Sequence, residues 1–241
     1  MSKKRDIKLF DGEKRIDGRK LDELREIEMK VDVIEKANGS AIVSFGNTVA
    51  LAAVYGPKLM LPKYLQEKKA VVFCRYNMTP FSVDERKKPG PDRRSIELSK
   101  VIRKALEPAI FLEDFPRARI DIYVEILQAD GSTRVTAINA ASLALAMAGI
   151  PMRDLVVACS AGKIDGELAI DLNGKEDNFG EADVSFAMMP SKNLVTLLQV
   201  DGELTSREIK KLFSMLKEKV NYIYNMQKKV LKDYYINYNY E

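Results

Sequence analysis

The sequence predicts an α+β protein in which helices pack against largely antiparallel sheets. Hydrophobic periodicity along the chain indicates several strands, a helix, a strand, a second helix, further strands and a long final helix. Apolar residues make up 46% and charged residues 31%, the balance of a soluble globular chain rather than a disordered one. The 241 residues suffice for two small, closely packed halves, which we place at 10–150 and 151–235 and expect to form one compact unit.

Strands dominate the first half. Residues 1–20 are highly charged, and we expect them to be loosely ordered. Residues 26–55 alternate between apolar and polar positions, which is the period of half-buried strands, and residues 70–78 and 118–128 continue this pattern. Turn-forming pairs separate these stretches at Asp11-Gly12, Asp17-Gly18, Asn38-Gly39 and Gly46-Asn47. A helix is expected over about residues 95–106.

The second half opens after an alanine-rich helix predicted at residues 135–148. Two strands are expected around a turn at Asp165-Gly166, followed by an acidic loop at residues 174–183. Two more strands precede a long amphipathic helix, whose start carries the capping-box pattern Thr205-Ser206-Arg207-Glu208. The tail YYINYNYE is expected to be frayed or docked on a partner.

Composition excludes several kinds of chemistry. The chain has no histidine, which removes Ser-His-Asp and Cys-His catalysis and every histidine-ligated zinc site. Cys74 and Cys159 lie in apolar runs, as buried free thiols of a reducing cytosol do. The start resembles no signal peptide and no apolar run approaches a membrane span, so we expect a cytoplasmic protein. Chemistry must come from carboxylates, cationic side chains, backbone amides or an oxygen-liganded metal.

A short polar motif, Gly131-Ser132-Thr133-Arg134, stands at the start of the alanine-rich helix. Free backbone N–H groups and the positive end of the helix dipole attract anions there, and a guanidinium pairs well with phosphate oxygens. The alternative is an ordinary Ser or Thr helix cap with an incidental arginine. An apolar helix favours the anion site, because a cation at the mouth of a buried helix needs a counter-charge.

Two arginines, Arg93 and Arg94, fall in or beside the first turn of the preceding helix, where Asp92 or Ser95 can serve as cap. Cations are disfavoured at this end of a helix, and an incoming anion would reverse that cost. The arm before them adds Arg86, Lys87 and Lys88. The motif therefore indicates phosphodiester binding, against the alternative of a solvated basic loop.

The acidic loop offers a third set of candidates. Asp177 and Asp183 flank a glycine-containing turn, and Asp183 begins an apolar strand. This placement suits a general acid beside a magnesium ligand, whereas the alternative is a solvated acidic turn. Together, the three motifs predict a phosphate pocket, a cationic track for a nucleic-acid backbone and a carboxylate that manages the leaving group. Because phosphate is itself a nucleophile, such phosphorolysis requires no histidine base.

Three long runs of this sequence resemble the RNase PH family of phosphorolytic 3′→5′ exoribonucleases. They are NMTPFSVDERKKPGPDRRSIELSKVIRKALEP, QADGSTRVTAINAASLALAMAGIPMRDL and DLNGKEDNFGEADVSFAMMPS. The resemblance extends over about residues 10–235 and is closest to the catalytic ring subunits of archaeal exosomes. It implies the RNase PH-like fold of two related halves, the release of nucleoside diphosphates from RNA 3′ ends, and a reverse reaction that adds RNA tails.

The resemblance also implies roles for individual residues. Arg93 and Arg94 would hold the backbone near the RNA 3′ end, and residues 131–134 would bind the attacking phosphate. Asp177 and Asp183 would both be catalytic and would both ligate Mg²⁺ or Mn²⁺, with Asp177 assisting the chemical step and Asp183 beside it as metal ligand. The family more usually reads Ala-Gly-Ser-Arg or Ala-Gly-Thr-Arg at the phosphate site. Here the glycine stands one place early, which leaves open which backbone amides face the phosphate.

A ring assembly is a further implication. The resemblance implies a hetero-hexamer, a trimer of dimers with an inactive paralogue, capped by RNA-binding subunits, through which single-stranded RNA is threaded. A basic loop is a candidate lining of the channel, with Lys58, Lys63, Lys68 and Lys69. Two alternatives remain from the sequence: a non-catalytic ring subunit that only binds RNA, and a homohexameric RNase PH that trims transfer RNA.

Overall fold

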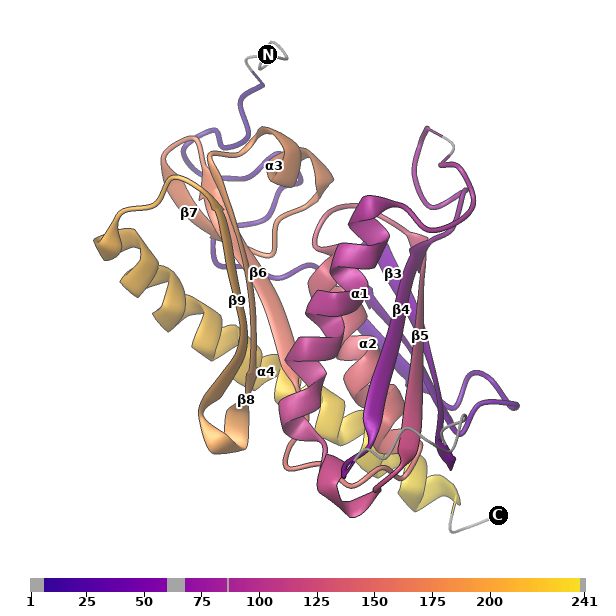
Figure 1. The fold of residues 1–241 in the computed structure, drawn as a ribbon. Helices are drawn as coiled ribbons and strands as arrows, with labels where there is room; N and C mark the ends of the chain where they lie inside the picture. Colours follow the sequence, from indigo (N-terminus) through magenta and orange to yellow (C-terminus); the bar gives the residue numbers. More distant parts are fainter. Residues whose placement is uncertain (1–6, 60–67, 86, 239–241) are drawn as a thin grey trace.

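Two β-sheets enclose two helices in this computed structural model, which describes residues 7–59, 68–85 and 87–238 (Figure 1). The first sheet has the strand order β1-β2-β3-β5-β4. Its strands are β1 (Ile27–Val31), β2 (Gly39–Phe45), β3 (Thr48–Leu59), β4 (Val71–Met78) and β5 (Ala118–Gln128). Neighbouring strands are antiparallel except β4 and β5, which run parallel. Parallel neighbours require a crossover, which contains α1 (Arg93–Leu106), packed on β4.

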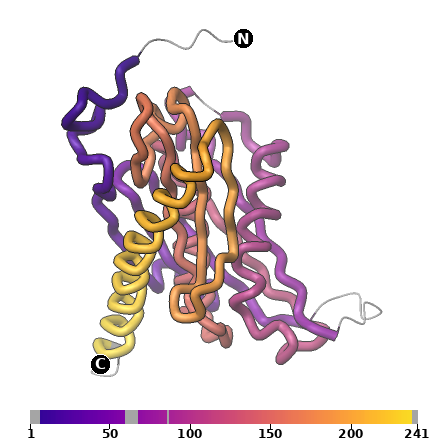
Figure 2. The backbone as a smooth tube through the Cα atoms, turned by 90° about the vertical axis from the view of Figure 1, so that its left-hand side faces the viewer, coloured from indigo at the N-terminus to yellow at the C-terminus, as the bar shows by residue number. Residues whose placement is uncertain are grey.

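The second sheet is antiparallel throughout, with the order β7-β6-β8-β9. Its strands are β6 (Val157–Ile164), β7 (Glu167–Ile170), β8 (Ala182–Met189) and β9 (Leu194–Gly202). The short helix α3 (Gly174–Phe179) connects β7 to β8. Helix α4 (Ser206–Tyr238) crosses the outer face of this sheet, as Figure 2 shows from the side. Its start is fixed as predicted, because Glu208 accepts from the Thr205 backbone N–H at 2.7 Å.

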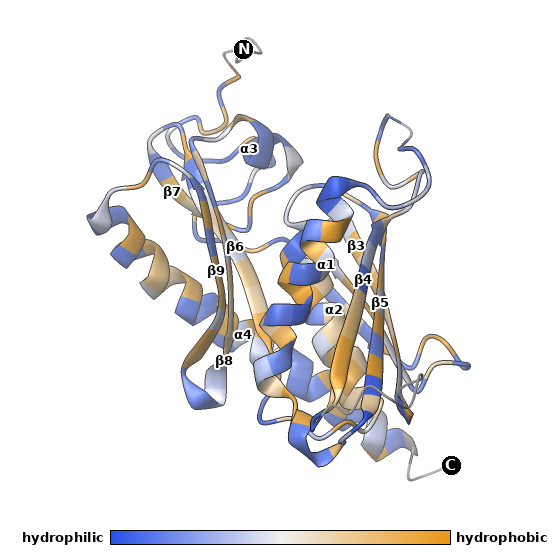
Figure 3. Ribbon diagram, viewed as in Figure 1, coloured by the Kyte–Doolittle hydropathy of each residue, from blue (hydrophilic) through white to orange (hydrophobic). Residues whose placement is uncertain are grey.

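The central helix α2 (Thr133–Met147) lies between the two sheets and contacts strands of both. Buried residues surround it, which confirms the prediction of a buried helix. Its small side chains permit close approach: a Cβ added at Gly39 on β2 would lie 2.2 Å from the backbone N of Ala148. Hydrophilic residues gather at α3 and at the first turn of α1, at one end of the molecule (Figure 3). Short 3₁₀ turns occur at Glu107–Ala109, Leu112–Asp114 and Pro190–Lys192.

Four local expectations were wrong. Residues 7–20 are docked rather than loosely ordered, since Leu9 is buried and Arg15 forms a buried ion pair with Glu176. The acidic loop contains α3, which Asn173 caps. Helix α4 continues to Tyr238, so the first part of the tyrosine-rich tail is helical rather than frayed. Helices α1 and α2 each begin two residues before their predicted starts, which places the arginines of both motifs inside them.

No helix in the described ranges is long and apolar enough to cross a membrane.

Candidate active site

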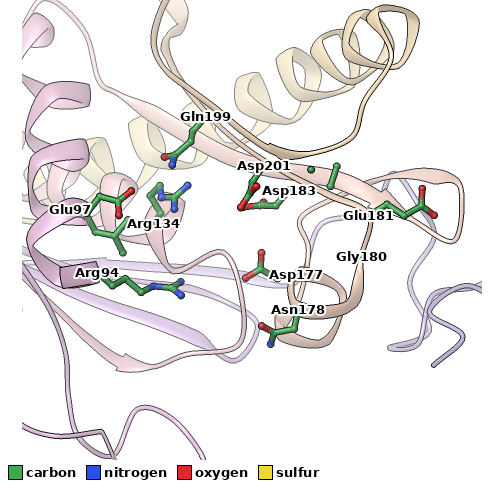
Figure 4. Close-up of a pocket in the computed structure, with 13 residues that line it drawn as sticks. Arg94, Glu97, Arg134, Asp177, Asn178, Gly180, Glu181, Asp183, Gln199 and Asp201 are labelled. Atoms are coloured by element: carbon green, nitrogen blue, oxygen red, sulfur yellow. The ribbon is translucent and has the colours of Figure 1, made fainter. Parts of the chain in front are cut away.

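A cavity of about 550 Å³ lies between α1, α2, α3, β8 and β9 (Figure 4). One wall is cationic and carries Arg94 of α1 and Arg134 of α2. The facing wall is acidic and consists of Asp177, Asp183 and Asp201. Among the residues that the structure describes, no ion pair joins the two walls. The cavity therefore separates opposite charges across a space that a ligand with both phosphate and metal-binding groups can occupy.

The first turn of α1 places Arg94 at the cavity. Asp92 caps this helix by accepting from the Ser95 backbone N–H at 2.6 Å, and Ser95 completes the capping box. Hydrogen bonds from Lys87 and from the Ser95 backbone amide lower the pKa of Asp92 to about 2, so this capping carboxylate remains ionised. A charged cap offsets part of the cost of two arginines at a helix N-terminus. Arg93 is exposed and does not line the cavity.

The start of α2 has no side-chain cap. Ser132 occupies the N-cap position, but its side chain makes no cap hydrogen bond. Its hydroxyl donates instead to the Leu172 carbonyl at 2.7 Å and lies 2.6 Å from the Ser160 hydroxyl. The Thr133 hydroxyl accepts from Tyr76 at 3.1 Å and keeps its own proton to donate. The simple helix-cap alternative is therefore wrong, and the first-turn N–H groups of α2 have no side-chain cap.

Arg134 provides the most direct sign of a missing ligand. Its Nη1 donates to the Ser185 hydroxyl at 3.1 Å, which fixes the guanidinium against β8. Its Nε is buried and has no hydrogen-bond partner. Buried donors are nearly always paired in native proteins, because an unpaired one costs about 1–3 kcal/mol. A donor held rigidly in this state at the mouth of α2 is what an anion-binding site requires.

The acidic wall combines three carboxylates from three elements. Asp177 lies on α3, and Asp183 lies on β8 opposite Asp201 on β9. Burial raises the pKa of Asp177 above its usual range, against the influence of Arg94. Burial also raises the pKa of Asp183 to about 6, and the nearby charge of Asp177 adds to this. Asp177 and Asp183 therefore keep their protons up to a higher pH, nearer to neutral, than exposed aspartates do.

Two cavity residues, Gln199 and Asp201, were not predicted from the sequence. They face Ser185 and Asp183 across the β8–β9 hairpin in register. The available signal was the polar interruption of the apolar run LVTLLQVDG at alternate positions, which marks one face of a strand.

A buried ionic network ties the N-terminal segment to both walls. Arg15 donates to both carboxylate oxygens of Glu176, the residue next to Asp177, and to the Ile170 carbonyl at 2.6 Å. Arg25 binds Asp171 through two nitrogens. Glu176 also closes the capping box of α3. The position of Asp177 thus depends on a segment that lies far away in the sequence.

The remaining predicted residues lie outside the cavity wall. Gly131 and Ser132 form the loop into α2 and Thr133 is its first residue, but none of the three lines the cavity. Lys58 makes an ion pair with the buried Asp121, and Lys68 and Lys69 are exposed. Lys63 and Arg86 lie outside the described residues.

The acidic wall also fits a hard divalent cation. In the described part of the chain, no group of three or more His, Cys, Asp or Glu residues is arranged to hold a metal. Mg²⁺ does not need such a cage, because it is commonly bound by one or two carboxylates together with waters and substrate phosphates. Asp177 and Asp183 raise the local negative charge enough to shift a pKa, which is the environment that such an ion would neutralise.

Known proteins are similar to this chain over most of its length. The 3′ exoribonuclease family model RNase PH matches residues 23–151 with its domain 1 and residues 154–217 with its domain 2. The exosome complex component Rrp41 of Pyrococcus furiosus is 58% identical over 238 residues, covering 98% of this chain and 95% of that protein. The Methanopyrus kandleri protein of the same name is 53% identical over 222 residues, covering 92% of this chain and 93% of that protein.

Two solved structures share the fold. Rice Rrp46 superimposes with a TM-score of 0.80 at 24% identity, covering 90% of this chain and all (100%) of that one. A chain of the Archaeoglobus fulgidus exosome with RNA bound to the active site superimposes with a TM-score of 0.76 at 24% identity, covering 90% and 92%. The predicted α+β fold is thereby confirmed as RNase PH-like. With both family domains in order over most of its length, this chain belongs to the RNase PH 3′ exoribonuclease family.

Proposed function

We propose that this chain is the catalytic subunit of an archaeal exosome-like ring and degrades RNA from its 3′ end by phosphorolysis. The observation that carries this proposal is the buried, unpaired Nε of Arg134, a residue that lines one cavity together with Asp177, Asp183 and Asp201. The relatives named Rrp41 support the exosome assignment. The two buried free cysteines, Cys74 and Cys159, are compatible with the cytoplasmic location that we propose.

Inorganic phosphate is both substrate and nucleophile in this reaction. Arg134 and the open first-turn amides of α2 hold it beside the last phosphodiester, while Arg94 holds the RNA backbone. A phosphate oxygen forms a bond to the terminal phosphorus, and the bond from that phosphorus to the 3′ oxygen of the preceding nucleotide breaks. The products are a nucleoside diphosphate and an RNA shorter by one nucleotide. The same groups support the reverse reaction, which extends RNA.

The departing 3′ oxygen needs a proton or an equivalent positive charge. Asp177 supplies the proton, a role that typically contributes roughly 10²–10⁴-fold to rate. Asp183 would hold Mg²⁺ or Mn²⁺ beside Asp177, and such an ion would offset the negative charge that develops in the reaction. Asp201, opposite Asp183, adds to the negative potential that attracts the ion.

The relatives named as exosome components support a proposal that this chain works in a complex. We propose a hetero-hexameric ring, a trimer of dimers with an inactive paralogue, capped by RNA-binding subunits and threaded by the 3′ end of single-stranded RNA. The scaffold alternative is disfavoured because Arg134, Asp177 and Asp183 meet in one cavity. The homohexameric RNase PH alternative is disfavoured because the similar proteins are named as exosome components.

A phosphate-dependence assay tests the proposal. The chain, co-expressed with its paralogue, is incubated with a single-stranded RNA and Mg²⁺, with and without inorganic phosphate. We expect nucleoside diphosphates only when phosphate is present, and a loss of at least roughly 100-fold in kcat for Asp177→Asn. Release of nucleoside monophosphates without phosphate would show hydrolysis instead. Full activity of the Asp177→Asn ring would remove this residue from the mechanism.

A further inference from the structure

The β8–β9 hairpin carries two polar pairs at the cavity, of which Asp183, Asp201 and Gln199 line it, and the proposed chemistry uses only the first pair. Asp183 faces Asp201 in the first pair, and Ser185 faces Gln199 in the second. Ser185 has a partner, since it accepts from Arg134. Figure 4 shows the amide end of Gln199 reaching from β9 toward Arg134, and both residues line the cavity.

Two buried groups of opposite hydrogen-bonding character remain unpaired here. Arg134 Nε is a donor without an acceptor, and Gln199 Oε1 is an acceptor without a donor. Both atoms are withdrawn from solvent, so water does not readily replace the missing partner. The two groups line the same cavity but do not satisfy each other. A ligand seated between these two side chains would supply both missing partners once either side chain rotates toward it.

The pair defines the chemistry of the ligand. Arg134 Nε can donate to an anionic oxygen, and Gln199 Oε1 can accept from a hydrogen-bond donor within the same cavity. A phosphate oxygen close to a hydroxyl meets both needs. Two substrates of the proposed reaction carry that combination: RNA, whose ribose hydroxyl lies beside its phosphodiester, and monohydrogen phosphate, through its P–OH group.

We infer that Gln199 is a substrate-binding residue whose side-chain oxygen accepts a hydrogen bond from a substrate hydroxyl while Arg134 binds the neighbouring anionic oxygen. This inference rests on the proposed phosphorolysis and adds a specificity contact to it. A site that hydrogen-bonds a hydroxyl discriminates against the analogue that lacks it, because its buried acceptor is then left unpaired.

Gln199→Leu tests the contact, because it removes the acceptor at similar volume, and Gln199→Met keeps the side-chain length. The matched control is Thr196→Val on the same strand. The Thr196 hydroxyl is also buried without a partner, but Thr196 does not line the cavity. All variants are compared with the wild type in the assembled ring, and only variants whose melting temperature equals that of the wild type are used.

Two arms identify the hydroxyl. The first measures kcat/KM for an all-ribose RNA and for RNAs with a 2′-deoxynucleotide at the last or second-last position. The second measures KM for phosphate at saturating RNA. We expect Gln199→Leu and Gln199→Met to lose roughly 2- to 10-fold in one arm only, the value of one ordinary hydrogen bond. Loss of the preference for ribose assigns the sugar hydroxyl, and a raised phosphate KM assigns the P–OH group.

Unchanged values in both arms overturn the inference, as does an equal loss in Thr196→Val. A uniform fall in kcat with neither KM nor sugar preference altered also overturns it, because that result indicates a structural role. If the wild-type ring releases no nucleoside diphosphates at all, the proposed function fails, and the assignment of Gln199 fails with it.

Discussion

The guanidinium of Arg25 binds both carboxylate oxygens of Asp171, with Nη2 2.6 Å from Oδ1 and Nε 3.0 Å from Oδ2. The Arg25 backbone N–H adds a bond of 2.8 Å to Oδ2, and its Nη1 donates to the Asp130 carbonyl at 2.6 Å. Although burial opposes it, the ion pair with Asp171 raises the pKa of Arg25. This buried pair connects the segment before α3 with the loop before α2. It therefore helps to fix the position of Asp177 relative to Arg134.

Breaking this pair from one side should strongly destabilise the fold. Asp171→Asn leaves the buried Arg25 guanidinium without its counter-charge, and we expect a loss of about 3–5 kcal/mol in the free energy of unfolding. Asparagine tolerates the left-handed φ of 56° at this position, so the change isolates electrostatics from backbone strain. Urea denaturation at pH 7 measures the loss.

Asp165→Asn is the matched control. Asp165 also has a left-handed φ, of 47°, and its carboxylate accepts from the backbone N–H groups of Leu9 and Phe10. It has no ion-pair partner in the ranges that the structure describes, and we expect a loss of only about 1 kcal/mol. Equal losses for the two variants would show that the Arg25 charge is not the cause.

The second prediction concerns Gly131, the glycine that stands one place earlier than in related motifs. Its φ is 72°, and an added Cβ would lie 2.5 Å from the backbone carbon of Asn173. Gly131→Ala must therefore push the loop before α2 away from the start of α3. We expect overpacking and backbone strain together to lower the free energy of unfolding by about 2–4 kcal/mol. Thermal unfolding, followed by circular dichroism, measures the loss.

Gly149 separates the two contributions. Its φ of 69° is nearly the same, but an added Cβ would meet nothing within 4 Å. Gly149→Ala should therefore show the cost of left-handed backbone alone, about 1 kcal/mol. If Gly131→Ala costs no more than Gly149→Ala, close packing against Asn173 does not explain the glycine.

The third prediction is a pH dependence of stability caused by Asp183. Its pKa is about 6 in the folded protein, raised from 3.8 by burial and by Asp177. The folded state therefore binds more protons than the unfolded state between these values, and stability falls as pH rises through this window. Replacing Asp183 by asparagine removes this loss, which amounts to at most about 3 kcal/mol.

Melting temperatures of the wild type and Asp183→Asn, measured in EDTA from pH 4 to 8, test this sign. We expect the variant to gain stability over the wild type as pH rises, with the gain complete above about pH 6. Mg²⁺ should reduce the difference at pH 8, because a bound cation stabilises the ionised carboxylate. A constant difference across the pH range would mean that Asp183 titrates normally.

Local pattern was enough to predict much of this molecule. The strand at residues 118–128 was predicted at its exact bounds, since its alternation of apolar and polar residues is strong. Of the predicted site residues, Arg94, Arg134, Asp177 and Asp183 meet in one cavity. Each of the three motifs carries charged residues that the same reaction needs. The sequence alone therefore indicated that these residues lie close together.

Long-range pairing was not accessible in the same way. The charged N-terminal segment looked disordered because Arg15 finds its partner, Glu176, 161 residues away. Gln199 and Asp201 join the site through the register of the β8–β9 hairpin, which local composition does not determine. Helix α3 was missed although its capping box, Asn173 with Glu176, was present in the sequence. The clustered acidic residues are typical of a solvated turn, which conceals this helix start.

The last prediction separates the two arginines at the start of α1. Both are expected to hold the RNA backbone and both are exposed, but only Arg94 lines the cavity. For single strands, each neutralised phosphate contributes roughly 0.7 to the slope of log affinity against log salt. We therefore expect Arg94→Ala to lower that slope by about this amount and Arg93→Ala to lower it by clearly less. Binding of a labelled RNA to the catalytically inactive Asp177→Asn ring, measured across salt concentrations, gives both slopes. Equal slopes for the two variants would place both arginines on the RNA, and a loss confined to one RNA sequence would indicate base recognition rather than backbone contact.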